Sequence, residues 1–208
     1  MAQNFGGAAY HHSSSTPATD EPMTLAVWYK PSVANEPTVR VPISICNTSA
    51  RNAWLLYGSN ANLFAWQAAG ASDGQSGQNP PLTTDNQHCL GVFAANASRT
   101  GYYNGTAAAA NTTSLATSGV NLVVIGAWNN GGAYAGQVNA NISEAAIWSV
   151  ALTAAEITSL AKGFSPRRIR PQSLEFYCPL IRNTQDLRKG ITFTTVGTPT
   201  AAVHPRVY

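Results

Sequence analysis

Short runs of alternating apolar and polar residues, separated by clusters of Gly, Asn and Pro, run along most of the chain. These runs predict strands at 23–29, 39–46, 54–57, 62–67, 88–94 and 120–126, with 54–57 and 62–67 as a hairpin. Between them, residues 68–84 contain three glycines and a Pro-Pro pair, and we interpret this stretch as a long irregular loop. Residues 106–119 are interpreted as a loop and a strand edge. The pattern is that of an all-β protein.

One segment, residues 136–163, combines a strand with a well-marked helix. Val138, Ala140 and Ile142 recur at period two, which places them on one face of a strand, and a second apolar set follows Glu144. The pattern then changes to that of a helix, so we expect strand and helix to be consecutive elements.

The helix signals cover residues 153–162. Thr153 is placed to cap the first backbone N–H groups, and Glu156, three residues later, completes a capping box. Gly163 suits the left-handed position that follows a helix. We therefore predict one short helix near 153–162.

Several segments resemble the laminin-G-like, concanavalin A-like family in the same order along the chain. The strand and helix of 136–163 are similar to this family's C-terminal strand and helix. Residues 22–31, 101–105 and 124–126 resemble its early strand, its Tyr-x-Asn-Gly hairpin and its Ile-Gly strand end. Residues 174–180 resemble its closing strand, with Cys178 in place of the usual Trp. The resemblance implies an antiparallel two-sheet jelly-roll sandwich, a scaffold with many functions.

Length and composition agree with one such domain. The chain has 208 residues, of which 44% are hydrophobic and only 10% are charged. We expect a single jelly-roll domain over 1–208, with an N-terminal arm at 1–20 and a basic C-terminal segment at 163–208. A surface with few charges is inexpensive to desolvate, which favours a subunit of an assembly; it is also compatible with a well-solvated monomer.

Targeting and redox signals point to a protein made in a cytoplasm. The N-terminus has no basic start followed by an apolar run, so we expect no secretory signal, and no segment reaches transmembrane length. The three cysteines, Cys46, Cys89 and Cys178, are widely spaced, so we expect buried thiols and neither a disulfide framework nor a zinc site. Neither membrane association nor a cofactor is expected.

Basic residues concentrate after the helix. From Lys162 to the C-terminus there are eight basic and two acidic residues, and the densest group is Arg167, Arg168 and Arg170, with a proline on each side. Three interpretations remain open: contact with an acidic neighbouring subunit, contact with nucleic-acid phosphates, or a solvated surface that complements the helix C-terminus. The small net charge of +3 and the lack of interleaved aromatic residues disfavour nucleic acid.

Candidate catalytic residues are mostly missing. Glucanases on the same scaffold place acids at alternate positions of one strand, so that two carboxylates lie about 5 Å apart. The nine acidic residues here are scattered, so no such pair is expected. His11 and His12 are adjacent and would face opposite sides of a strand, so they do not predict a metal site. Asp73 and Asp85 are the only pair that suggests calcium. We expect no enzyme and no bound metal.

Sugar binding is the alternative function on a lectin-like scaffold. It requires an aromatic ring that stacks on a pyranose and amides that bond its hydroxyls. Trp128, Asn129, Asn130 and Tyr134 surround an Asn-Gly turn and have this composition. The second interpretation is a hairpin whose two aromatic rings pack into the protein.

The C-terminal sequence from Gly197 to Tyr208, together with the helix segment, resembles laminin-G-like proteins of tailed bacteriophages. This resemblance implies a virion-surface location and partners among capsid or tail proteins and sibling subunits. Our leading hypothesis is therefore a non-enzymatic structural protein of a phage particle, either a head decoration protein or a fibre or tail component. A carbohydrate-binding module is the alternative, and a glycan hydrolase is the hypothesis we favour least.

Overall fold

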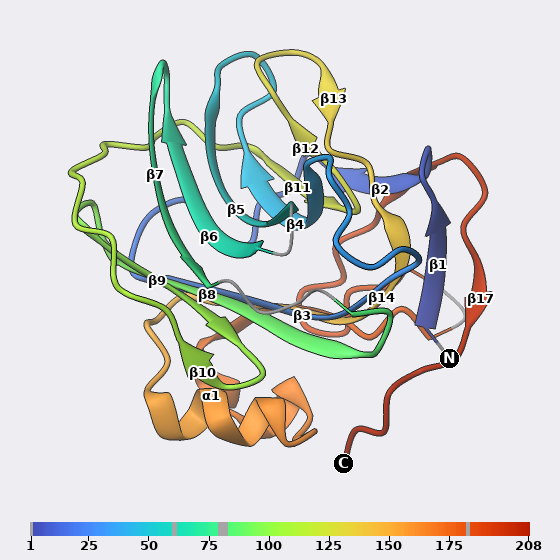
Figure 1. Ribbon diagram of the computed structural model, residues 1–208. Coiled ribbons are helices and arrows are strands. Elements are labelled where there is room, and N and C mark those ends of the chain that lie inside the picture. Colours follow the sequence, from blue (N-terminus) through green and yellow to red (C-terminus); the bar gives the residue numbers. More distant parts are fainter. Residues whose placement is uncertain (1, 60–61, 79–82, 182–183) are drawn as a thin grey trace.

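Two antiparallel sheets lie face to face in the computed structural model, which describes residues 2–59, 62–78, 83–181 and 184–208 (Figure 1). The first, sheet A, has the strand order β10-β9-β8-β3-β14-β1-β17, with β15 also paired to β14. Its strands are β1 (Ala2–Gly6), β3 (Met23–Pro31), β8 (Gln87–Ala95), β9 (Ser98–Tyr103), β10 (Thr106–Ala107), β14 (Asn139–Trp148), β15 (Leu174–Cys178) and β17 (Thr200–Ala202).

The second, sheet B, has the order β16-β2-β11-β4-β5-β6-β7. Its strands are β2 (Tyr10–Ser13), β4 (Arg40–Cys46), β5 (Asn52–Ser59), β6 (Asn62–Ala69), β7 (Ser72–Gln78), β11 (Leu122–Ile125) and β16 (Thr194–Val196). A separate hairpin joins β12 (Trp128–Asn129) to β13 (Tyr134–Ala135). The predicted sandwich is confirmed, and so is the β5–β6 hairpin.

The alternating residues of the predicted strands form the core between the sheets. Leu25 and Ile142 of sheet A belong to the same fully buried cluster as Ile43, Trp54 and Val123 of sheet B. Period-two alternation explains this arrangement, because every second side chain of a strand points to the same face.

Strand β14 organises sheet A. Along one edge it pairs with β3, and along the other it pairs first with β1, at residues 139–142, and then with β15, at residues 145–148. The change of partner falls at Glu144, which has φ +54° and lies in a bulge of the β3 pairing. The second apolar set after Glu144 thus results from a bulge that resets the alternation.

Helix α1 (Ala154–Ala161) lies across the outer face of sheet A (Figure 1). The predicted capping box is confirmed: the Thr153 hydroxyl accepts a hydrogen bond from the Glu156 N–H, and the Glu156 carboxylate accepts one from the Thr153 N–H at 2.7 Å. Gly163 follows with φ +91°, as expected. Two 3-10 turns, η1 (Pro166–Arg168) and η2 (Pro171–Ser173), connect the helix to β15. Within the described residues, no helix is long and apolar enough to cross a membrane.

Two predictions about irregular segments are wrong. Residues 68–84 were expected to be a loop, yet β7 lies within them and pairs along β6; residues 79–82 lie outside the described part of the chain. The glycines of β7 reflect close packing, since a Cβ at Gly74 would lie 2.1 Å from Arg99 Nη1. The N-terminal segment was expected to be an arm, but its residues 2–13 include β1 and β2, which pair inside the two sheets.

Candidate functional site

The hairpin β12–β13 lies against the outer face of sheet B. Trp128 pairs with Ala135 and Asn129 with Tyr134, so consecutive side chains point to opposite sides of this ribbon. The turn is closed by the Asn130 N–H, which donates to the Ala133 carbonyl at 2.8 Å. The hairpin therefore separates Trp128 from Tyr134.

An aromatic cleft lies on the Trp128 side of the hairpin. It has a volume of about 180 Å³ and is lined by Val39, Val41, Arg51, Leu55, Tyr57, Trp66, Trp128 and Asn130. Trp66 and Trp128 meet edge to face, with ring centroids 5.1 Å apart, and they are only 8% and 7% exposed. The cleft thus has apolar walls and two polar side chains, Arg51 and Asn130.

Arg51 is held in a fixed position at this cleft. Its guanidinium carbon lies 4.9 Å from the centroid of the Trp66 ring. Nη1 donates to the Gly70 carbonyl at 3.0 Å and Nη2 to the Asp73 carboxylate at 2.8 Å. Asp73, considered above for calcium, is therefore the ion-pair partner of Arg51, and Asp85 accepts a hydrogen bond from the Thr83 hydroxyl. No group of three or more potential metal-ligating side chains occurs among the residues that the structure describes.

Tyr134 lines a different groove on the other side of the hairpin. This groove has a volume of about 400 Å³, and most of its lining residues carry a hydroxyl group. It is lined by His12, Ser13, Ser14, Ser15, Thr48, Leu122, Tyr134, Thr192 and Thr194. Tyr134 stacks on Tyr10 with centroids 4.4 Å apart. Asn129 is buried, and its side-chain oxygen accepts the Gly132 N–H at 2.7 Å. Trp128 and Tyr134 are therefore not the two walls of one sugar site, as the sequence suggested, and Asn129 supports the turn.

Comparison with known proteins identifies the family. A family model described as the concanavalin A-like lectin/glucanases superfamily, Laminin_G_3, matches residues 5–158. The chain belongs to this superfamily. No curated protein sequence matches it. The predicted resemblance is confirmed at this level, whereas the resemblance to phage virion proteins stays a prediction.

Solved structures similar to this superfamily member share its fold at low identity. A heptameric SAP-like pentraxin from Limulus polyphemus has a TM-score of 0.69 and 15% identity, over 98% of this chain and 94% of the pentraxin. The CBM40 of the Ruminococcus gnavus IT-sialidase has a TM-score of 0.65 and 14% identity, over 77% and 96%. Mouse laminin α1 domains LG4-5 have a TM-score of 0.59 and 11% identity, over 74% and 43%. At such identities the likeness establishes the fold alone.

The three arginines of the cluster in this superfamily member have different surroundings in the structure. Arg170 has φ +41°, and its Nε lies 2.5 Å from a Glu156 carboxylate oxygen, so it ties the junction of η1 and η2 back to the helix. Arg167 and Arg168 are exposed on η1 and form no ion pair with any described residue. Only these two remain available to a partner; the choice among partners stays a prediction.

The buried Glu144 carboxylate contacts two side chains of the C-terminal part of the chain. One oxygen accepts the Tyr177 hydroxyl at 2.7 Å, and the other lies 2.9 Å from His204 Nε2. Burial, together with the Glu144 charge, raises the pKa of Tyr177. These contacts fix the C-terminal segment to β14 and β15.

Sequence reasoning missed most of the cleft. Trp66 lies within the predicted strand 62–67 without any sign of a binding role, and Arg51, Tyr57 and Val39 carried no motif. The one sequence signal for Trp66 was the two-residue alternation of β6. It places Trp66 on the face opposite to Ala65, which belongs to the core between the sheets.

Proposed function

We propose that this chain is a non-catalytic carbohydrate-binding domain and that the aromatic cleft is its sugar site. The observation that carries the proposal is the convergence of three aromatic side chains, Tyr57, Trp66 and Trp128, with Arg51 and Asn130 on one cleft. Aromatic rings contact the apolar face of a pyranose, while guanidinium and amide groups bond its hydroxyls.

The size of the cleft favours a short ligand. At about 180 Å³ it is smaller than the ~300 Å³ at the lower end of drug-sized sites, so we expect it to hold one terminal sugar residue and not an internal stretch of a chain. The fixed guanidinium of Arg51 adds pre-organisation, because its side chain is already ordered before a ligand arrives.

The structural neighbours support this proposal. The R. gnavus CBM40 is also similar in its complex with α2,3-sialyllactose, with a TM-score of 0.57 and 13% identity, over 77% of this chain and 95% of that module. A related fold is therefore used for glycans elsewhere. Which sugar this chain takes is a question for experiment.

A glycan array with the full chain, followed by calorimetric titration of the strongest ligand, tests the proposal. Asn130 is exposed, and its turn contact uses its backbone, so Asn130→Ala removes the amide without opening the hairpin. We expect Asn130→Ala to weaken binding about tenfold, the effect of one lost hydrogen bond to an otherwise satisfied ligand. The matched control is Tyr134→Ala on the opposite side of the hairpin, which leaves affinity unchanged. Absence of any glycan ligand, or a loss caused by Tyr134→Ala alone, contradicts the proposed site.

A second candidate function is a structural subunit of a phage particle that binds sibling subunits or the capsid. It is favoured by the exposed large apolar side chains of the described residues, five of seven of which lie in the last quarter of the chain: Phe164, Ile181, Leu187, Val203 and Tyr208. Arg167 and Arg168, without ion-pair partners among the described residues, lie in the same segment.

Light scattering after size-exclusion chromatography tests the self-association that this second function includes. We expect an oligomer that Arg167→Glu combined with Arg168→Glu dissociates, since both guanidinium groups are free to contact a neighbour. A monomer whose mass does not change with concentration contradicts self-assembly.

A further inference from the structure

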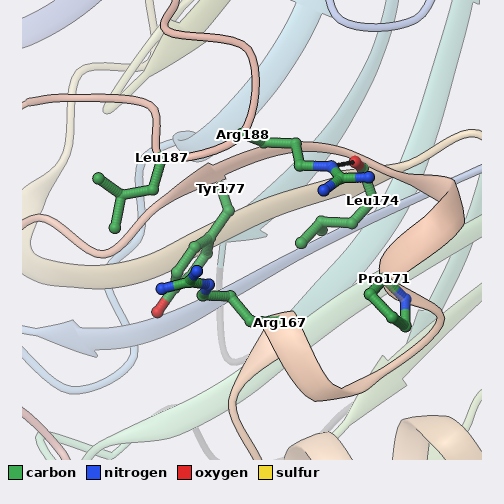
Figure 2. Close-up of a pocket in the computed structure, with 6 residues that line it drawn as sticks. All are labelled: Arg167, Pro171, Leu174, Tyr177, Leu187 and Arg188. Carbon is green, nitrogen blue, oxygen red and sulfur yellow. Dashed lines mark hydrogen bonds between the residues drawn. The ribbon is translucent and has the colours of Figure 1, made fainter.

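A small pocket lies on the sheet A side of the sandwich, far from the aromatic cleft, between η1 and the segment that follows β15 (Figure 2). Its volume is about 140 Å³, and it is lined by Arg167, Pro171, Leu174, Tyr177, Leu187 and Arg188. Figure 2 shows the Arg167 guanidinium beside the hydroxyl end of Tyr177 and the Arg188 guanidinium beside Leu174. The pocket therefore combines two cations with apolar walls.

Both arginines have unused hydrogen-bond donors. Arg188 Nε donates to the Leu174 carbonyl at 2.7 Å, which fixes the direction of its guanidinium, while its two terminal amino groups have no partner within the described part of the chain. Arg167 makes no hydrogen bond or ion pair with any residue that the structure describes. A guanidinium carries five N–H donors, so the two groups together can bond both oxygens of an acid.

The acidic groups nearest the pocket are already engaged inside the protein. The Asp186 carboxylate accepts four backbone N–H groups, those of Tyr177, Arg188, Lys189 and Ile191, at 2.9 to 3.2 Å. Glu175 pairs with Lys189 and accepts the Ser149 hydroxyl. Glu144 is bonded to Tyr177 and His204. None of these three carboxylates pairs with Arg167 or Arg188, so the free donors of both arginines stay available at the pocket that the two residues line.

The wall between the arginines is rigid. Tyr177 is held at both ends: its backbone N–H donates to Asp186 at 2.9 Å and its hydroxyl donates to Glu144 at 2.7 Å. Glu144 is itself fixed in the β14 bulge. A wall that is already ordered costs little entropy when a ligand arrives.

We propose that this pocket binds one carboxylate group carried on a short apolar stem, with Arg167 and Arg188 bonded to its oxygens and the stem against Leu174, Leu187 and the Tyr177 ring. Inorganic phosphate fits less well, because it presents oxygens in every direction and half of this lining has no donors to offer them. A free aliphatic acid and the side chain of a glutamate on another protein share this chemistry. The proposal does not rest on the sugar site.

Titration of the full chain with sodium butyrate, followed by ¹H–¹⁵N correlation spectra, tests the pocket. We expect saturable shifts at the amides of Leu174, Tyr177 and Leu187, and none with butyramide, which has the same shape without the charge. Arg167→Gln removes no internal contact, so it is expected to fold normally and to weaken butyrate binding about tenfold, as loss of a charged hydrogen bond does. Arg188→Gln is expected to weaken it by a similar factor.

Arg168→Gln is the matched control, since it removes the same charge from the neighbouring position of η1 without lining the pocket. We expect it to leave butyrate affinity unchanged. Equal effects of Arg167→Gln and Arg168→Gln, equal binding of butyramide, or no saturable shift at millimolar butyrate overturns the proposal. So does phosphate that binds more tightly than butyrate. A blocked glutamyl peptide in parallel distinguishes the two sources: tighter binding than butyrate supports a protein side chain, and weaker binding supports a free acid.

Discussion

The outer faces of the two sheets are covered in different ways. On sheet A, helix α1 closes over a buried cluster that includes Trp148, Ile157 and Leu160. On sheet B, the short hairpin β12–β13 covers only part of a comparable cluster that includes Trp66 and Trp128, and the aromatic cleft stays accessible beside it. The covering element, more than the sheet beneath it, therefore decides what each face offers to a ligand.

Tryptophan side chains have different surroundings on the outer faces of the two sheets. Trp148 is fully buried, and its indole N–H donates to the Ile169 carbonyl at 2.8 Å, so its polar atom is satisfied inside the protein. Trp128 reaches the cleft and meets Trp66 edge to face. The surroundings of Trp148 suit a residue that anchors helix α1 to sheet A, and those of Trp128 suit a residue that lines a binding site.

Removal of the Trp148 anchor is expected to have the largest effect on stability. Trp148→Ala leaves a cavity beneath the helix and an unpaired Ile169 carbonyl, so we expect the free energy of unfolding to fall by about 4 kcal/mol in urea denaturation. Trp28→Ala, at a half-buried position of β3, serves as the control and should cost less than half as much. Equal losses would mean that the helix cover does not depend on Trp148.

Acid is expected to destabilise the protein through two buried histidines, His11 and His88. Neither of them lines the aromatic cleft or the pocket beside η1. Burial lowers the pKa of His88 to about 3 and that of His11 to about 4, below the 6.5 of an unfolded chain. Below pH 6.5 the unfolded state thus binds protons that the folded state excludes, and stability falls as the pH falls. At pH 5 each histidine costs about 2 kcal/mol.

Urea denaturation at pH 7 and pH 5 measures this loss. His88→Phe keeps a ring against Trp28, and Nδ1 of His88 is buried without a hydrogen-bond partner among the described residues, so the variant should roughly halve the loss. Identical stability at the two pH values would refute the assignment to these histidines.

The smallest expected effect concerns the helix cap. Thr153→Ala removes the capping hydroxyl and should lower the free energy of unfolding by about 1 kcal/mol. Thr158→Ala is the matched control, because Thr158 is half-buried within the helix and its hydroxyl bonds only the Ala154 carbonyl. Its change should be near zero, since alanine is the better helix former. A control that costs as much as the cap variant would argue against the capping box as a source of stability.

The fold was readable from the sequence where local signals agree. Alternation gave the inner strands, and the residues from Thr153 to Gly163 gave the helix with its cap. β7 was missed because it is an edge strand whose glycines, Gly74 against Arg99 and Gly77 against Phe64, leave it without an apolar alternation. The short strands of residues 2–13 were missed because their pairing partners lie more than a hundred residues away.

The candidate sites were harder to predict because they depend on contacts between distant elements. Asn130 and Trp128 carry a turn signal, but Arg51 and Trp66 join them only through the arrangement of β5, β6 and the hairpin. Arg167 was identified from its charge, whereas Arg188 meets it only because the segment after β15 folds back on η1. No local sequence pattern indicates such contacts between distant residues.

The central claim is that the open cleft on sheet B binds a glycan, and two exposed valines test it most directly. Val39 lines the cleft and is 40% exposed, whereas Val33 is 52% exposed and lies outside it. In calorimetric titration with the glycan found on the array, we expect Val39→Asp to weaken binding about tenfold, through loss of one apolar contact to the sugar. Val33→Asp should bind as the unchanged protein does. Equal affinity of both variants and the parent chain would contradict the claim.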